Sequence, residues 1–265
     1  MVLFLDSGVG GLVYHDAFRD LRPDVETACL ADSKWFPYGR RNPGELQERL
    51  CVLVERIHRQ RPLSAVVVAC NTASVVALQA LRARFSFPVV GVVPAVKPAA
   101  ALTGSGAIAI LATVRTAGDP YTAELTRQFA RLCRVTALGL PELVHATEAH
   151  FCDTDGNHDA VRRVFREEVL PALPEDVDVV VLACTHFVRY RGLFQEILGS
   201  AVQVVDSLEG VTSRVDSLVR EDGTAIPRSG EELPTLYHTG EISPGYRCLA
   251  GHYRLHRLDV PGGDP

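Results

Sequence analysis

The sequence predicts an α/β protein of two similar three-layer domains with mostly parallel sheets, related by pseudo-twofold symmetry and with the active site between them. Short apolar strands alternate with amphipathic helices along most of the 265 residues, which is typical of parallel sheets with right-handed crossovers. The alternation breaks between Lys97 and Gly106 and then restarts. Two of the apolar strands, Ala65 to Ala69 and Val179 to Leu182, lead into a cysteine. We interpret these strands as equivalent parts of a duplicated unit.

Apolar periodicity predicts the elements of the first half in order. Strands are short apolar runs, whereas helices repeat apolar residues every three to four positions. The helical spacing is clearest for Leu46, Leu50, Leu53, Val54 and Ile57. The predicted elements are a strand from Val2 to Leu5, a Gly-rich turn and helix from Gly8 to Leu21, a strand from Glu26 to Ala31, a helix from Glu45 to Arg59, a strand from Ala65 to Ala69, a helix from Ser74 to Arg84 and a strand from Val89 to Val93.

The second half repeats this alternation after the break. The predicted elements are a strand from Ala107 to Leu111, a helix from about Tyr121, a strand around Val135, a helix near 158 to 170, a strand from Val179 to Leu182, a helix from Gly192 to Leu198, a strand from Val202 to Val205 and a helix from Leu208 to Arg220. The polar stretch from Glu221 to Glu232 is expected to be an exposed loop.

The last segment, Thr235 to Asp259, resumes with an apolar strand and a short helix. We expect it to pack against the first unit. The first domain is therefore predicted to comprise residues 1–96 and 208–265, and the second residues 97–207.

Composition favours a cytoplasmic enzyme with a small-molecule substrate. The formal net charge of -5 and the pI near 6.0 provide no basic face for nucleic acid. The apolar N-terminus reaches only from Met1 to Leu5, and no apolar run is long enough to span a membrane. The seven cysteines are an odd set without a Cys-x-x-Cys pair, which favours reduced thiols over a disulfide framework.

Cys70 and Cys184 are the principal candidates for chemistry. Both follow continuous β-branched strands at the point where polar residues begin, and open α/β sheets bind their ligands at that edge. Each also precedes a predicted helix, a setting that lowers the pKa of a thiol. A single buried cysteine is most often a small apolar side chain. Two at equivalent positions indicate a pocket with a thiol on each side, suited to moving a proton through a carbon centre.

The stretch from Asp6 to Gly11 is a second candidate site. A glycine turn that leads into a helix offers free backbone N–H groups for a carboxylate or phosphate. A dinucleotide site is disfavoured because Val13 replaces the last glycine of that motif. Ser7 as a helix N-cap is the structural alternative. Asp6 ends a buried strand, so its carboxylate needs partners and is placed to activate a neighbouring group.

Three other chemistries fit the spacing poorly. A cysteine phosphatase has the motif Cys-x5-Arg, but Val76 stands in the arginine position after Cys70. Zinc binding by Cys184 and His186 lacks a nearby third ligand. Lys34 and Lys97 are the only lysines, and neither lies in a pattern that indicates pyridoxal phosphate.

Several motifs, taken in order and at their intervals, closely resemble glutamate racemases. They cover the chain from residue 2 to about residue 257. The motifs are Asp6-Ser7-Gly8-x-Gly10-Gly11, Pro37-Tyr38-Gly39, Cys70-Asn71-Thr72-Ala73-Ser74, Val93-Pro94-Ala95-Val96-Lys97-Pro98, Ala183-Cys184-Thr185-His186 and Tyr237-His238-Thr239-Gly240.

This resemblance implies racemisation of glutamate without a cofactor or a metal, in a homodimer that supplies D-glutamate for peptidoglycan. It implies that Cys70 acts on the D-glutamate side and Cys184 on the L-glutamate side. By the same resemblance Asp6, Glu148 and His186 assist the thiols. The implied substrate-binding residues are Asp6, Ser7, Tyr38, Gly39, Asn71, Thr72, Thr185 and His186.

Three positions depart from the family pattern. Arg115 stands where a small residue is common, Val188 replaces a proline, and Glu148 lies in a divergent context. Two alternatives to glutamate racemisation stay open: a racemase of aspartate or another small amino acid, and a non-catalytic amino-acid-binding member of the fold.

Overall fold

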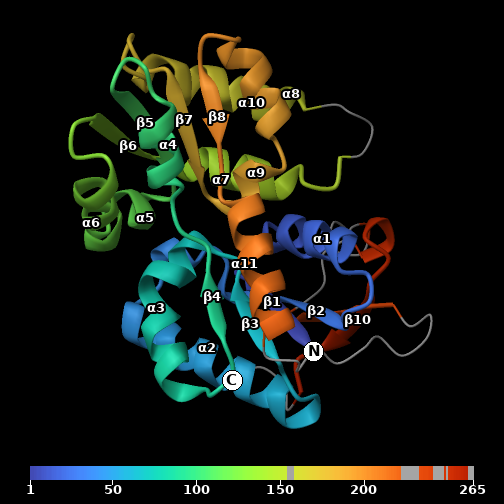
Figure 1. Ribbon diagram of the computed structural model, residues 1–265. Helices are drawn as coiled ribbons and strands as arrows, with labels where there is room; N and C mark the ends of the chain where they lie inside the picture. Colours follow the sequence, from blue (N-terminus) through green and yellow to red (C-terminus); the bar gives the residue numbers. More distant parts are fainter. Residues whose placement is uncertain (154–157, 222–232, 241–247, 249, 262–265) are drawn as a thin grey trace. The chain divides into compact units, whose positions relative to one another are not determined.

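The computed structural model describes residues 1–153, 158–221, 233–240, 248 and 250–261. The chain forms two compact units, which Figure 1 shows with their elements labelled. Unit 1 comprises Met1–Val92 and Leu208–Pro265, and unit 2 comprises Val93–Ser207. Every strand pair in both sheets is parallel, which confirms the predicted α/β class with parallel sheets.

The sheet of unit 1 has six strands in the order β10-β9-β2-β1-β3-β4. They are β1 (Val2–Asp6), β2 (Thr27–Ala31), β3 (Ala65–Val68), β4 (Val89–Gly91), β9 (Thr235–His238) and β10 (His256–Asp259). The chain runs from β1 outward to β2 and then returns to the other side of β1 with β3. Such a reversal leaves a crevice between the carboxyl ends of β1 and β3, where open α/β sheets bind ligands.

Four helices cover the two faces of this sheet (Figure 1). They are α1 (Gly11–Leu21) and α11 (Leu208–Glu221) on one face, and α2 (Pro43–Gln60) and α3 (Asn71–Arg84) on the other. The predicted apolar stripe of α2 is buried in the core. Helix α2 begins two residues before the predicted start, because Asn42 caps it by accepting hydrogen bonds from the Gly44 and Glu45 N–H groups.

The C-terminal segment adds two strands to unit 1. Strand β9 pairs with β2, which confirms that this segment returns to the first unit. Strand β10 was not predicted, because all four of its residues are exposed and carry no apolar pattern. The predicted loop from Glu221 to Glu232 lies outside the described residues except for Glu221, which ends α11.

The sheet of unit 2 has four strands in the order β6-β5-β7-β8. They are β5 (Ala107–Ala112), β6 (Arg134–Gly139), β7 (Val179–Ala183) and β8 (Gln203–Val205). This order repeats β2-β1-β3-β4 of unit 1, with β5 in the place of β1 and β7 in the place of β3. The structure therefore supports the duplication that the two strand and cysteine motifs indicated.

Unit 2 contains helices that the apolar pattern did not reveal. The helical segments are α4 (Val96–Leu102), α5 (Val114–Gly118), α6 (Pro120–Phe129), α7 (Pro141–Ala149), α8 (Asp159–Val164), a π-helical turn (Phe165–Val169), a 3-10 turn (Leu170–Ala172), α9 (Thr185–Val188) and α10 (Arg191–Leu198). Of these, α4, α5, α7 and α9 were not predicted, whereas α6, α8 and α10 lie where helices were predicted. The break expected from Lys97 to Gly106 is shorter than predicted, because α4 extends to Leu102 and Pro98 lies in its first turn, where a proline costs no hydrogen bond. The next strand starts at Ala107, as predicted. Helices α5 and α9 are too short to show periodicity.

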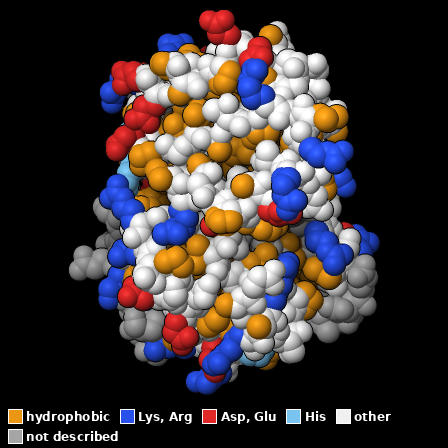
Figure 2. All heavy atoms as spheres, turned by 90° about the vertical axis from the view of Figure 1, so that its left-hand side faces the viewer, with side chains coloured by type: hydrophobic (Ala, Val, Ile, Leu, Met, Phe, Trp, Pro, Cys, Tyr) orange, Lys and Arg blue, Asp and Glu red, His pale blue; other side chains and the backbone are white. Residues whose placement is uncertain are grey.

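Strand β6 forms one edge of the second sheet and is only partly covered. Figure 2 shows the side of the molecule that carries α5, α6 and β6, with apolar side chains interspersed among charged ones. Val114, Tyr121, Phe129 and Leu132 from this region are exposed, Leu132 to 93%. None of the six residues of β6 is buried, so the sequence placed this strand only approximately. No helix among the described residues is long and apolar enough to cross a membrane.

Stability should depend on pH through His15, which is fully buried on α1. Its Nε2 contacts the Thr27 hydroxyl at 2.9 Å, and burial lowers its pKa to about 3. The folded state therefore keeps His15 neutral while the unfolded state takes up a proton below about pH 6.5. We expect the free energy of unfolding to fall by about 2 kcal/mol more in the wild type than in His15→Gln between pH 6.5 and 4.5.

Urea unfolding at the two pH values measures this difference. Gln retains a donor near the Thr27 hydroxyl and does not titrate, so parallel losses in both proteins would show that His15 is not the responsible group.

Candidate active site

Each of the two sheets has the same kind of crevice, beyond the carboxyl ends of two neighbouring strands, with a predicted cysteine beside it. In unit 1, Asp6 ends β1, and Cys70 follows β3 on the neighbouring strand. In unit 2, Thr113 follows β5, and Cys184 follows β7. In each unit, the cysteine therefore lies beyond the carboxyl end of the strand that follows the reversal of the chain, which is β3 in unit 1 and β7 in unit 2. Their positions in the two topologies are equivalent.

The turn after β1 is held by its own aspartate. The Ser7 N–H and hydroxyl both donate to Asp6 Oδ1, at 2.6 and 3.2 Å. Capping of α1 by Ser7, the structural alternative, does not occur, because Gly10 is the N-cap residue and no side chain among the described residues caps this helix. A Cβ atom on Gly11 would lie 3.0 Å from Asp6 Cβ and 3.2 Å from Ala69 Cβ. Glycine at this position lets α1 start directly against β1 and β3.

Cys70 is the N-cap residue of α3 and is almost completely buried. Helix α3 starts at Asn71 rather than at the predicted Ser74. The thiol therefore lies at the N-terminus of a 14-residue helix. Both polar atoms of the Asn71 side-chain amide are buried without a hydrogen-bond partner among the described residues. Buried amides are normally paired. The unpaired Asn71 amide therefore indicates a ligand with hydrogen-bonding groups beside Cys70.

Ser74, the last residue of the motif that begins at Cys70, has a structural role. Its hydroxyl donates to the Val68 carbonyl at 3.1 Å and accepts from the Val92 N–H at 3.0 Å. These bonds join the ends of β3 and β4 and occupy the hydroxyl. Thr72, by contrast, is buried in the first turn of α3 beside Asn71.

We call the residues around Cys70 and those around Cys184 the two half-sites. Tyr38 belongs to the Cys70 half-site and lies in the short helical turn Tyr38–Arg40. Its hydroxyl donates to Asp32 Oδ2 at 2.8 Å. Burial raises the pKa of Tyr38 well above its usual value, and the nearby charges of Asp32, Cys70 and Asp6 add to this shift. Tyr38 is therefore a neutral hydrogen-bond donor close to Cys70 and Asp6. Gly39 follows it in the same turn and is half-buried.

The network around Tyr38 contains functional candidates that were missed from the sequence. Arg49 and Thr239 both donate to the carboxylate of Asp32. The available signal was the position of Arg49, which lies on the buried stripe of α2 between Leu46 and Leu50. A charged residue on an apolar stripe is rarely buried without a specific partner.

Unit 2 joins Cys184, His186 and Glu148 in one chain of contacts. Cys184 is the N-cap residue of α9, and its sulfur lies 3.8 Å from His186 Nδ1. The other ring nitrogen, Nε2, donates to Glu148 Oε2 at 2.5 Å. Glu148 comes from α7, a helix that the sequence did not predict, and α7 packs against α9. Thr185 is buried between the cysteine and the histidine.

The groups that contact His186 favour its protonated form. Burial alone would lower the pKa of His186, but the charge of Glu148 and the hydrogen bonds with Cys184 and Glu148 raise it well above its usual value. An imidazolium at this position places a positive charge beside the Cys184 sulfur. Zinc binding by Cys184 and His186 is disfavoured geometrically, because Cys184 and Glu148 contact opposite nitrogens of the ring and do not converge on one ion.

The positions that depart from the family pattern lie near the Cys184 half-site. Val188 ends α9 and is buried. Arg115 is half-buried in α5, directly after β5. Neither replaces one of the polar residues in the chain from Cys184 to Glu148.

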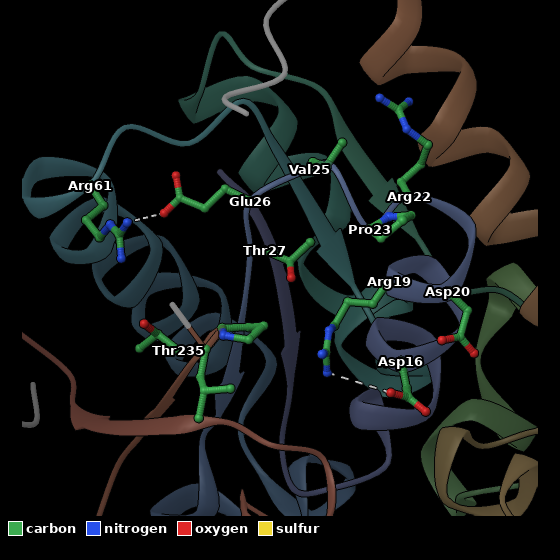
Figure 3. Close-up of a pocket in the computed structure, with 12 residues that line it drawn as sticks. Asp16, Arg19, Asp20, Arg22, Pro23, Val25, Glu26, Thr27, Arg61 and Thr235 are labelled. Atoms are coloured by element: carbon green, nitrogen blue, oxygen red, sulfur yellow. Dashed lines mark hydrogen bonds and ion pairs between the residues drawn. The ribbon is translucent and has the colours of Figure 1, made fainter. Parts of the chain in front are cut away.

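A separate cavity in unit 1 is not part of this site. Its volume is about 200 Å³, and Figure 3 shows the residues that line it, including Arg19, Glu26 and Arg61. It lies at the amino ends of β2 and β9, opposite to Asp6 and Cys70. Arg61 pairs with Glu26, and Arg19 contacts Asp16 and the Tyr253 carbonyl. Both of these arginines thus have partners within the protein.

Comparison with known proteins identifies relatives along most of the chain. Residues 14–213 match the model of the Asp/Glu/Hydantoin racemase family. Glutamate racemase of Salmonella typhimurium is 42% identical over 221 residues, which are 83% of this chain and 77% of that protein.

Solved structures show the same similarity. Escherichia coli glutamate racemase, solved with L-glutamate and the activator UDP-MurNAc-Ala, superposes with a TM-score of 0.86 at 37% identity, over 97% of this chain and 96% of that one. Isoform RacE1 of glutamate racemase from Bacillus anthracis has a TM-score of 0.80 at 26% identity, over 98% and 97% of the two chains. The chain therefore belongs to the Asp/Glu/hydantoin racemase family and is an amino-acid racemase of the glutamate racemase group.

Proposed function

We propose that this enzyme interconverts L-glutamate and D-glutamate without a cofactor, with Cys70 and Cys184 as the two proton-transfer groups. The observation that carries the proposal is the equivalence of the two cysteines, since each is the N-cap residue after the same strand of two units with the same topology. In this proposal the two thiols act on opposite faces of the α-carbon of one substrate.

Proton transfer in the two directions uses the same groups in exchanged roles. From L-glutamate, the Cys184 thiolate forms an S–H bond as the Cα–H bond breaks, and the electron pair passes to Cα and the carboxylate. The Cys70 thiol then gives its proton to the opposite face, which leaves a thiolate on Cys70. From D-glutamate, Cys70 removes the proton and Cys184 returns one. No redox equivalent is consumed.

The surroundings of the thiols support this chemistry. Asp6 is proposed to assist Cys70, while His186 and Glu148 assist Cys184. Ser7, Tyr38, Gly39, Asn71, Thr72 and Thr185, together with Asp6 and His186, are proposed to bind the substrate. The unpaired amide of Asn71 supports this assignment, because it supplies both a donor and an acceptor beside Cys70. Fixed dipoles at a desolvated site stabilise the negative charge that develops on the carboxylate.

We further propose a cytoplasmic homodimer that supplies D-glutamate for peptidoglycan. These proposals rest on the family resemblance, and the molar mass in solution tests the dimer. A racemase of aspartate or another small amino acid is the alternative substrate class. A non-catalytic binding protein is the third possibility, but the retained cysteines, His186 and Glu148 disfavour it.

The proposed mechanism predicts that solvent hydrogen enters the product. When purified enzyme acts on L-glutamate in D2O, the D-glutamate formed should carry deuterium at Cα, because the Cys70 thiol exchanges with solvent before it donates. Early in the reaction, unreacted L-glutamate should retain protium. Chiral chromatography with mass spectrometry measures both.

A panel of amino acids provides the control for substrate. Faster turnover of aspartate than of glutamate would assign the alternative substrate class, and formation of unlabelled D-glutamate would contradict the two-thiol mechanism. Binding of glutamate without any change in circular dichroism of the substrate would identify a non-catalytic member.

A further inference from the structure

We propose that Arg49 is a positioning residue for the Cys70 half-site, which acts by fixing Asp32 and, through it, Tyr38 and the segment Asp32–Arg40. The inference rests on the proposed function, since it concerns proton transfer by Cys70. Arg49 lies on α2 and is not part of any motif that carried the family resemblance.

The ion pair between Arg49 and Asp32 is buried and bidentate. Arg49 Nε donates to Asp32 Oδ2 at 2.7 Å, and Arg49 Nη2 donates to Oδ1 at 2.6 Å. The side chains are 3% and 0% exposed. Such a paired geometry fixes the plane of the carboxylate as well as its position.

Two further donors complete the coordination of this carboxylate. The Tyr38 hydroxyl donates to Oδ2 at 2.8 Å, and the Thr239 hydroxyl donates to Oδ1 at 2.5 Å. Each oxygen of Asp32 thus receives one bond from Arg49 and one from another side chain. The direction of the Tyr38 hydroxyl is consequently set by the orientation that Arg49 imposes on Asp32.

Arg49 also contacts the middle of the same segment. Its guanidinium lies over the Trp35 ring, 4.7 Å from the centroid, and the guanidinium of Arg41 lies 5.2 Å from the same centroid. Arg41 Nε in turn donates to the Trp35 carbonyl at 3.0 Å. The segment is therefore fixed at its start by Asp32, in its middle by Trp35 and at its end by Tyr38.

The segment is fixed from a third direction by the end of β9. The Ser33 hydroxyl donates to the Thr239 carbonyl at 2.5 Å, and the Lys34 N–H donates to the Thr239 hydroxyl at 3.2 Å. Gly240 has φ of +69°, and a Cβ atom there would lie 3.2 Å from Lys34 Cβ. The close approach of this C-terminal strand places the Thr239 hydroxyl on Asp32.

Stability alone does not account for an arginine at this position. The other residues on this stripe of α2 are leucine, valine and isoleucine, and a buried ion pair gives no more stability than well-packed apolar side chains. The ion pair instead supplies orientation. Tyr38, which it orients, lies in the same buried cluster as Cys70, and the turn that carries Tyr38 packs against α3, the helix that Cys70 caps.

Substitution of Arg49 should slow proton transfer at Cys70 specifically. Arg49→Lys keeps the charge but loses the second hydrogen bond to Asp32 and the guanidinium over the Trp35 ring. We expect kcat/KM to fall about tenfold in Arg49→Lys and about 10²-fold in Arg49→Met, the range that follows from a small misplacement of a site group. The two enantiomers have equal free energy, so kcat/KM falls equally in both directions and does not identify the affected thiol.

Substrate deuterium isotope effects identify it. If the Cys70 step becomes slower, the isotope effect on kcat/KM should rise for D-glutamate deuterated at Cα, because its bond is broken by Cys70. It should fall for deuterated L-glutamate, because removal of that proton by Cys184 becomes a reversible step before the slow one. The measurement compares wild type and Arg49→Lys in both directions, with thermal unfolding to verify that both are folded.

Arg59→Lys is the matched control, since Arg59 lies on the same helix with an exposed side chain and an ion pair to Glu55. It should retain the wild-type rate and isotope effects. Wild-type activity in Arg49→Lys, a loss of activity with unchanged isotope effects, or a change in the opposite sense would each overturn the proposal. Failure of the proposed function is distinct, because the wild type itself would then form no deuterated product in D2O.

Discussion

Replacing either Cys70 or Cys184 with Ser is expected to reduce racemisation in both directions by at least about 10³-fold, the upper part of the range for loss of a positioned acid or base. A hydroxyl is a much weaker acid than a thiol, so serine at either position neither forms the anion that removes the α-proton nor donates one as readily. Both directions fail together, because each turnover uses both groups. Circular dichroism of the substrate measures the rate in each direction.

The five other cysteines provide the control for this prediction. Cys51 and Cys133 are half-buried free thiols outside the two crevices, so Cys51→Ser and Cys133→Ser should retain activity. Substantial racemisation by Cys70→Ser or Cys184→Ser, with the protein shown to be folded, would contradict the assignment of the thiols.

Replacing Glu148 with Gln is expected to lower kcat/KM about tenfold to 10²-fold and to move the alkaline limb of its pH profile to lower pH. Glu148 keeps the pKa of His186 high through its charge and its hydrogen bond to Nε2. Without that charge the pKa of His186 falls, so the imidazolium beside Cys184 is lost at a lower pH. Activity that depends on this imidazolium declines at the same lower pH.

Steady-state rates between pH 6 and 10 measure the shift. Glu142→Gln is the matched control, because Glu142 lies exposed in the first turn of the same helix. An unchanged alkaline limb in Glu148→Gln would show that His186 does not support Cys184 as a cation.

The two half-sites differ in how their thiols are supported, although the cysteines are equivalent in topology. Cys184 contacts a histidine that a carboxylate keeps protonated. Cys70 has Asp6 on the adjacent strand and the neutral phenol of Tyr38 nearby. Substitutions in one half-site should therefore change the isotope effects for the two enantiomers in opposite senses.

Local patterns predicted the strands well because buried parallel strands are continuous apolar runs. The strand from Ala65 and the strand from Val179 begin where predicted, and each leads into its cysteine at the polar boundary, after Ala69 in one case and directly in the other. The helices were predicted less completely. Helices α5 and α9 span five and four residues and are too short for an apolar stripe, while the exposed strand β10 has no apolar pattern.

By itself the sequence determined the α/β class, the duplication and the two strand and cysteine motifs, because these depend on the local order of apolar and polar residues. Only the tertiary structure showed that β1 and β3, and likewise β5 and β7, are neighbours. It also showed the contacts from Glu148 to His186 and from Arg49 to Asp32. These pairs come from separate elements, and strand order and helix packing, which no local pattern encodes, decide which side chains meet.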